Sequence, residues 1–256
     1  MTILGYILFF TLIGSVFSLI GGVFLLFKEK FALKISHFLA SFAAGVLLGA
    51  AFFDLLPEAA SNAADAPQNI NVFSWALIGI VVFFLIERSI HWFHHHEEYH
   101  RHKTETKTTI PLIIIGDTVH NFVDGVVIAA SFLVSVPLGV VTALSVAAHE
   151  IPQEIGDFGL LLHKGLKRKK IILVNVLSAS VAILGALITY SLGNVLAPYI
   201  PILLALTAGF FIYIASSDLI PEIHYERRKG FALIESLLLI LGVLTIYITT
   251  LLIPHQ

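Results

Sequence analysis

The sequence predicts an all-α integral membrane protein with eight transmembrane helices in a 3+2+3 arrangement and both termini outside. Three observations predict this fold class. Of the 256 residues, 57% are hydrophobic and only 12% are charged, whereas a soluble domain is typically about 25% charged. The apolar residues come in runs of twenty or more, as in membrane helices. The Lys and Arg residues are confined to alternate connections between these runs.

Eight apolar spans can be marked along the chain, each long enough to cross a hydrocarbon core of about 30 Å as a helix. The first begins almost at the N-terminus and is too long for the core of a signal peptide, so we interpret it as a transmembrane helix. The predicted spans are residues 3–27, 35–60, 72–92, 110–134, 138–162, 171–193, 199–221 and 231–253.

The positive charges predict the orientation of these spans. Fourteen of the fifteen Lys and Arg residues follow the first, third, fifth or seventh span, and Arg88 lies in the last turns of the third. The other connections, residues 61–71, 135–137 and 194–198, contain none. Since Lys and Arg concentrate in cytoplasmic loops, the side that carries them is predicted to be cytoplasmic. Both termini then lie outside.

A repeated motif predicts internal symmetry. The second span ends in Asp-Leu-Leu-Pro-Glu (54–58) and the seventh in Asp-Leu-Ile-Pro-Glu (218–222). The predicted topology places these motifs on opposite faces of the membrane, as in inverted repeats of transporters. We therefore expect a single transporter domain over 1–256, with repeats at 1–92 and 171–253 around central helices at 110–162. The alternative is that the motif merely terminates two helices.

The central spans contain the strings His-Asn-Phe-Val-Asp-Gly (120–125) and His-Glu-Ile-Pro-Gln-Glu (149–154). A charged side chain at mid-membrane costs roughly 2.5–3.5 kcal/mol, so several on adjacent helices imply a compensating ligand. Residues four apart share a helical face. The pairs that do so are His120 with Asp124, His149 with Gln153, and Glu150 with Glu154; Asn121 and Asp124, three apart, do likewise.

Two such helices packed together would converge imidazole, carboxylate and amide groups on one point. Neutral imidazole suits zinc and other first-row metals, and carboxylates add charge and harder oxygen ligands. Pro152 leaves the carbonyl of Ala148 without its usual helical partner, which indicates a hydrated cavity at this depth. The sequence therefore predicts a divalent metal site. Asp117 and Asp157 flank it as orienting partners, as proton acceptors or as groups near the water interface.

The pair of motifs, one span apart, resembles the signature of the Zrt-/Irt-like (ZIP) metal transporters, and the resemblance extends over the whole chain. It implies a binuclear metal site on helices four and five and the uptake of zinc, iron, manganese or cadmium ions into the cytoplasm. The ligands that it implies are His120, Asn121, Asp124, His149, Glu150 and Gln153. Adding Glu154, we expect seven metal-site residues, with Zn²⁺ as the principal transported ion and Fe²⁺, Mn²⁺ and Cd²⁺ as further candidates.

The sequence departs from the family pattern at Gln153, where many members have a bridging histidine or glutamate. A glutamine carbonyl is a neutral and weaker ligand. We therefore expect one well-formed site around His120, Asp124 and Glu150, and a second that is weak or transient.

The segment between the third and fourth spans, at about 91–109, is predicted to be a histidine-rich cytoplasmic loop. Six of the twelve histidines lie there, and such tracts are a compositional signal for metal binding. The alternative is a solvated loop with incidental histidines.

Other functions remain open at this point. A metal exporter or antiporter would use the same buried acids, and a metal sensor would bind without flux. An intramembrane zinc protease is disfavoured, because His149-Glu150-x-x is followed by Gln153 rather than by a second histidine. The expected partners are divalent metal ions and the lipid bilayer, with no nucleic acid; a homodimer is compatible with the resemblance. The expected location is the cell membrane (inner or plasma membrane), crossed several times.

Overall fold

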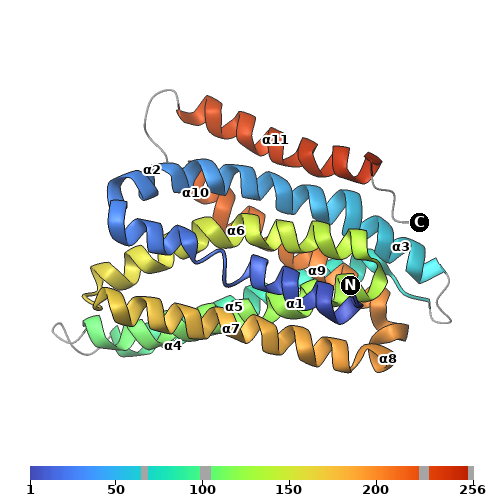
Figure 1. The fold of residues 1–256 in the computed structure, drawn as a ribbon, viewed down its shortest axis with the longest axis horizontal. Coiled ribbons are helices and arrows are strands. Elements are labelled where there is room, and N and C mark those ends of the chain that lie inside the picture. The colour runs from blue at the N-terminus through green and yellow to red at the C-terminus, as the bar shows by residue number, and fades with distance from the viewer. Residues whose placement is uncertain (65–68, 99–104, 225–230, 253–256) are drawn as a thin grey trace.

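The computed structural model describes residues 1–64, 69–98, 105–224 and 231–252, and only the backbone for 90–98, 105–109, 112 and 222. Within those ranges it holds helices and no strand. The helices run roughly along the long axis of an elongated bundle (Figure 1). Six helical segments are long and apolar enough to cross a membrane: Ile20–Ala64, Val72–Ser89, Ile113–Val134, Arg168–Ser191, Gly193–Leu219 and Phe231–Leu252.

The first predicted span, 3–27, is a broken helix rather than a continuous one. Helix α1 (Ile3–Gly14) is twelve residues long, and α2 (Ile20–Gly49) begins after a break of five residues, 15–19. Ser15 and Ser18, both buried, lie in the break, and each donates its hydroxyl hydrogen to a backbone carbonyl, Ser15 to Thr11 and Ser18 to Ser15. Side chains thus satisfy backbone groups that the interrupted helix leaves open, as membrane interiors require.

The chain turns back at Lys28, whose φ of −138° and ψ of 60° interrupt α2. Figure 1 shows the reversal at the left end of the bundle. Beyond it α2 continues into the π-helical turn η1 (Ala50–Leu55) and α3 (Leu56–Ala64). The first two predicted spans therefore correspond to α1 with the start of α2, and to the rest of α2 with η1 and α3.

The remaining predicted spans correspond to helices with shifted ends. These are α4 (Val72–Glu98), α5 (Glu105–Val134), α6 (Val136–His163), α7 (Arg168–Ser191) and α11 (Phe231–Leu252). After the short α8 (Gly193–Leu196) and η2 (Ala197–Tyr199), the seventh span is α9 (Ile200–Tyr213), π-helical η3 (Ile214–Leu219) and α10 (Ile220–His224). The predicted loop at 91–109 is helical at 91–98 and 105–109, so the loop expectation is wrong there. Its histidine side chains lie outside the described residues.

The described ends and connections divide between the two ends of the bundle. In Figure 1, α1 begins and α11 ends at the right, where α8 also lies. The connection between α6 and α7, with Lys164 and Lys167, lies at the left, as does the reversal after Lys28. The two described connections that carry lysines therefore lie at the same end of the bundle, and the described ends of the chain lie at the other, as the charge pattern predicts.

The repeated motif has the same backbone in both places. The amide of Leu56 donates to the carbonyl of Ala51, and that of Ile220 to Ala215, each five residues back. A proline follows each of these amides directly. Because proline has no N–H and its ring clashes with the carbonyl four residues earlier, the preceding turn widens into a π-helix. The two motifs therefore share both sequence and local structure.

Glycines allow three helix pairs to pack with their backbones in contact: α2 with α11, α4 with α9, and α5 with α7, the last through Gly125 and Gly185. A Cβ atom on Gly45 of α2 would collide with the carbonyl oxygen of Leu239 on α11, and one on Gly242 with that of Phe42. In the same way Gly79 of α4 and Gly209 of α9 face each other's helices. Gly45 and Gly209 occupy the same position relative to the two Asp-x-x-Pro-Glu motifs, nine residues before the aspartate. The pairs α2–α11 and α4–α9 are therefore related in sequence as well as in packing.

We expect Gly45→Ala to destabilise the bundle by about 1–3 kcal/mol, because the added methyl group meets backbone that cannot rotate away. Thermal unfolding in detergent measures the effect. Gly156→Ala, on a helix where a Cβ meets nothing within 4 Å, is the matched control and should be neutral or slightly stabilising. Equal thermal stability of the two variants would contradict the proposed backbone contact.

Candidate metal centre

The two sequence motifs meet where α5 and α6 pack against each other. The helices are joined by the single residue Ser135, so they run antiparallel, and His120 and His149 reach the same depth from opposite chain directions. Pro152 lies inside α6 and is buried. It removes the hydrogen bond that the carbonyl of Ala148 would otherwise accept, one residue before His149.

Four side chains bring one donor atom each to a common point. The donor atoms of His120, Asp124, His149 and Glu150 all lie within 4.8 Å of one another. The Nε2 atoms of the two histidines are 3.2 Å apart. His120 Nε2 lies 3.4 Å from Glu150 Oε1 and 3.8 Å from Asp124 Oδ2. His149 Nε2 lies 3.6 Å from Asp124 Oδ2 and 3.9 Å from Glu150 Oε1.

These separations fit one metal ion at the centre of the four donors. Zinc binds nitrogen and oxygen ligands at about 2.0–2.2 Å, so tetrahedral ligands lie about 3.3–3.6 Å from each other. Two imidazole nitrogens and two carboxylate oxygens also match the ligand preference of zinc. The arrangement can therefore hold a divalent cation and neutralise its charge.

The side chains of the centre are largely buried, so a bound cation would offset the cost of keeping their charges out of water. The His149 side chain is 0% exposed, Glu150 1% and Asp124 4%, while His120 keeps 12%. Neither oxygen of Glu150, nor Oδ2 of Asp124, has a hydrogen-bond partner. Buried carboxylates are costly unless paired or bound to a metal.

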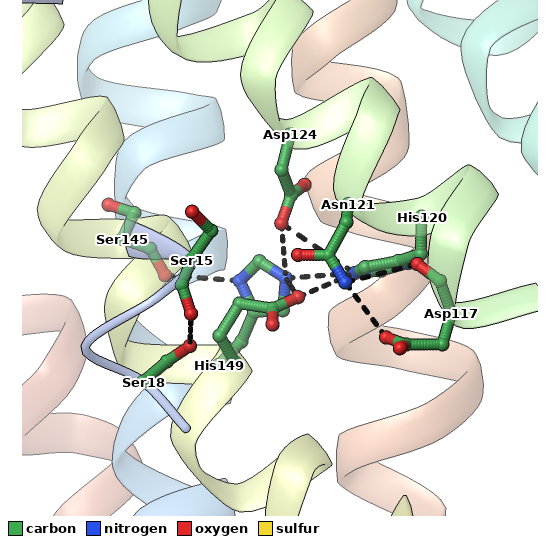
Figure 2. A network of polar contacts seen from close by, with 9 residues as sticks. Ser15, Ser18, Asp117, His120, Asn121, Asp124, Ser145 and His149 are labelled. Carbon is green, nitrogen blue, oxygen red and sulfur yellow. Dashed lines mark hydrogen bonds and ion pairs between the residues drawn. The ribbon is translucent and has the colours of Figure 1, made fainter. Parts of the chain in front are cut away.

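Backbone and neighbouring side chains hold the two histidine rings. His149 Nδ1 lies 3.1 Å from the carbonyl oxygen of Ser145 (Figure 2). Because a carbonyl only accepts, this contact places the proton on Nδ1 and leaves Nε2 free to bind a metal. The ring of Phe83, on α4, packs edge-on against His120 with centroids 5.7 Å apart. Phe211 of α9 packs against His149 in the same manner at 6.4 Å.

The break between α1 and α2 also adjoins the centre. A Cβ on Gly14 would contact Val146, and one on Gly21 would contact the carbonyl of Ile151. The irregular segment 15–19 therefore lies alongside the part of α6 that carries His149, as the positions of Ser15 and Ser18 in Figure 2 show. Non-helical backbone at membrane depth is tolerated where protein or a polar cavity surrounds it.

Asn121 is buried beside the four donors and oriented by Asp117. Its amide nitrogen donates to Asp117 Oδ1 at 2.8 Å and to the Asp117 carbonyl at 3.1 Å (Figure 2). Its own Oδ1 is buried without a partner. An amide oxygen held in this way is available as a further neutral ligand. Of the three roles open to Asp117, the contact is that of an orienting partner, although the residue that it orients is Asn121 and not a histidine.

The remaining two predicted residues stand apart from the four converging donors. Gln153 is only partly buried, and Glu154 is fully buried one turn beyond Glu150. Glu154 is not among the four side chains that converge. The sequence analysis missed Ser145, Phe83 and Phe211, which position the histidine rings. The aromatic residues belong to distant helices and carry no motif, so only their packing identifies them.

Comparison with known proteins places this centre in a family. The family model for ZIP zinc transporters matches residues 2–111 and 96–250 of the chain. The chain belongs to the ZIP zinc transporter family. This family consists of transporters and not enzymes, which confirms the expectation that the protein is not an enzyme. Family membership and the apolar helices together make it a multi-pass membrane protein.

Several named relatives share the matched region. Zinc transporter ZIP10 of Homo sapiens is 35% identical over 144 residues, which cover 50% of this chain and 17% of that protein. Zinc transporter ZIP4 of Mus musculus is 40% identical over 132 residues, covering 52% of this chain and 20% of that protein. Zinc transporter ZIP13 of Pongo abelii is 31% identical over 229 residues, covering 83% and 66%. The matched regions thus span about a fifth of ZIP10 and ZIP4 and two thirds of ZIP13.

We expect His149→Ala to weaken zinc binding by about 100-fold or more, because it removes one of the four converging donors, and losing even a residue that only orients a metal-binding histidine costs about 10–100-fold in affinity. Isothermal titration of the purified chain with zinc measures the affinity. The matched control is His163→Ala, an exposed histidine at the end of the same helix, which should leave the affinity unchanged. Wild-type affinity in the His149→Ala variant would exclude His149 as a ligand.

Proposed function

We propose that this protein carries zinc ions across the membrane into the cytoplasm, and that the ion binds at the α5–α6 centre on its way. The observation that carries the proposal is the convergence of four donors, three of them buried and His120 partly so, on two helices inside an apolar bundle. The relatives ZIP10, ZIP4 and ZIP13 are zinc transporters, which favours the same ion. Iron, manganese and cadmium ions are further candidate cargo.

In the proposed centre, His120, Asp124, His149 and Glu150 bind the ion directly. Asn121 adds its amide oxygen, and Gln153 is a weak additional ligand from the partly exposed face of α6. A hydrated ion arriving at His120 would exchange water for these donors. Access would alternate between the two faces of the membrane while the ligands stay on the α5–α6 pair.

The proposed topology has eight crossings. Beyond the six apolar segments, α1 with the first turns of α2 makes one crossing, and α6 makes the other. Helix α6 has 28 residues, enough for a membrane helix, and owes its lower hydropathy to the metal-binding motif. The termini would then lie together outside, and the cell membrane would be the location. A homodimer stays a prediction.

The two halves are proposed to be inverted repeats. In support of this, each of the motifs at 54–58 and 218–222 contains the end of a π-helical turn. Gly45 and Gly209 each lie nine residues before the aspartate of the motif on their own helix. The corresponding helix pairs, α2 with α11 and α4 with α9, pack through facing glycines. Two repeats with equivalent helices in opposite orientations could each adopt the conformation of the other. Such an exchange would open the centre to one face of the membrane and then to the other, which is how inverted repeats produce alternating access.

Transport is tested by radioactive zinc uptake into proteoliposomes that contain the purified chain. We expect wild-type protein to accumulate zinc, and Glu150→Gln and Asp124→Asn to reduce uptake to the level of empty liposomes, since each removes a charged ligand. Glu29→Gln, an exposed acid on α2, is the control and should transport normally. Absence of uptake by the wild type, with binding intact, would favour a sensor over a transporter.

Topology and direction are tested together, because the chain has no cysteine and single cysteines can be introduced as labels. We expect Ser61→Cys, on α3, to react with an impermeant thiol reagent from outside the cell, and Lys169→Cys, on α7, to react only after permeabilisation. Zinc should then move toward the Lys169 side. Movement toward the Ser61 side would instead support an exporter.

A further inference from the structure

The two histidines of the centre are held in different ways. His149 is fixed through a backbone contact, because its Nδ1 lies 3.1 Å from the carbonyl oxygen of Ser145. His120 has no such contact: within the described residues, no hydrogen bond or ion pair reaches its Nδ1. A metal-binding histidine is normally oriented by a hydrogen bond at its other ring nitrogen. The direction of the His120 ring must therefore be fixed in another way.

The ring of Phe83 provides the contact that His120 lacks. It is 7% exposed and meets the His120 ring edge-on, with an interplanar angle of 88° and centroids 5.7 Å apart. Edge-on pairs of aromatic rings are a preferred arrangement at about 4.5–7 Å. Phe83 belongs to α4, whereas His120 belongs to α5. The direction of the His120 ring therefore depends on a helix outside the α5–α6 pair.

Phe83 itself lies between two contacts that join α4 to α9. One turn before it, a Cβ on Gly79 would collide with the backbone of α9, and one on Gly209 with that of α4. One turn after it, the Tyr213 hydroxyl donates to Oε2 of Glu87 at 2.5 Å. The glycine contact fixes the separation of the two helices on one side of Phe83, and the hydrogen bond fixes it on the other.

Tyr213 links this hydrogen bond to the aromatic contact. Its ring packs against Phe83 with centroids 5.5 Å apart, and the ring of Phe210 packs against Phe83 at 5.3 Å. The distance from the Tyr213 hydroxyl to Glu87 is typical of a hydroxyl that donates to a carboxylate, which is among the stronger hydrogen bonds in proteins. Both side chains are partly buried, where water competes less for the hydrogen bond.

We propose that Glu87 and Tyr213 are positioning residues for zinc binding. Their hydrogen bond holds Phe83 against His120 and so keeps Nε2 of His120 directed toward the other three donors. The inference rests on the proposed binding of zinc at the α5–α6 centre. It gives α4 and α9 a part in the affinity of a site whose four converging donors all come from α5 and α6.

The test is the zinc affinity of the full chain in detergent, measured by titration against a competing chelator. We expect Tyr213→Phe, which keeps the ring and removes the hydroxyl, to weaken binding by roughly three- to tenfold, less than the loss of about 10–100-fold for a group that contacts a metal ligand directly. Glu87→Ala should have the same effect. Glu87→Gln should bind zinc nearly as well as the wild type, because its amide oxygen can still accept the hydrogen bond.

The matched control is Tyr190→Phe, which removes a hydroxyl from an exposed tyrosine on α7 and should leave the zinc affinity unchanged. A Glu87→Gln variant that binds as weakly as Glu87→Ala would contradict the role of the hydrogen bond.

Two ligand-deficient backgrounds separate the positioning of His120 from a general effect on stability. In His120→Ala no imidazole remains to be held, so adding Tyr213→Phe should change the affinity by less than about twofold. In His149→Ala the His120 ring is still present, and Tyr213→Phe should weaken binding as it does in the wild type. A purely structural role would give the same loss in both backgrounds.

The outcomes distinguish this inference from the proposed function. Wild-type affinity in Tyr213→Phe, or an undiminished loss in the His120→Ala background, would overturn the positioning role and leave transport standing. Failure of wild-type uptake in proteoliposomes, with these affinity changes observed, would overturn transport and leave the positioning role standing. Absence of zinc binding by the wild type would overturn both.

Discussion

The cost of burying acids and imidazoles in an apolar bundle constrains the rest of the structure. Each of Asp124, Glu150 and Glu154 is at most a few per cent exposed, in a stretch of chain, residues 108–163, that contains no Lys or Arg. Such a group is stable only where opposite charge can be supplied, and a divalent ion supplies it without requiring a Lys or Arg inside the membrane. The helices around α5 and α6 therefore shield a polar interior whose acidic charge calls for a counter-ion.

Irregular backbone gathers near this polar interior. The break at 15–19 lies beside His149, Pro152 interrupts α6 within the second motif, and π-helical turns occur in the second and seventh spans. In water such interruptions would be satisfied by solvent. Inside a membrane each needs a side chain, a neighbouring polar group or an enclosed cavity, as the hydroxyl hydrogen bonds of Ser15 and Ser18 illustrate.

The packing around the centre separates rigid contacts from polar ones. Facing glycines bring α2 close to α11 and α4 close to α9, so those backbones contact directly. The α5–α6 contact holds the buried donors instead. The aromatic rings of Phe83 and Phe211 connect the two parts, because each belongs to the glycine-packed pair α4–α9 and touches a histidine of the centre. A shift of α4 or α9 would therefore alter the surroundings of His120 and His149 directly.

The sequence by itself predicted the helical class, most helix positions and the four side chains whose donor atoms converge. Residues four apart on a helix share a face, so His120 with Asp124 required no tertiary information, and the length of apolar runs is a local property. Membership of the ZIP family agrees with the resemblance carried by the two motifs.

The tertiary structure decided what spacing cannot show. The hydropathy of residues 3–27 predicts one continuous helix, because Ser15 and Ser18 are single polar residues among apolar ones. The break between α1 and α2 depends instead on the hydrogen bonds that these two serines make. Spacing likewise pairs Glu150 with Glu154, but the direction of each side chain is set by the neighbouring helix, and only Glu150 meets the histidines. The position of Asn121 depends on Asp117, and Phe83 reaches His120 from another helix. Contacts between distant segments have no local signature, so the shape of the centre is fixed by packing.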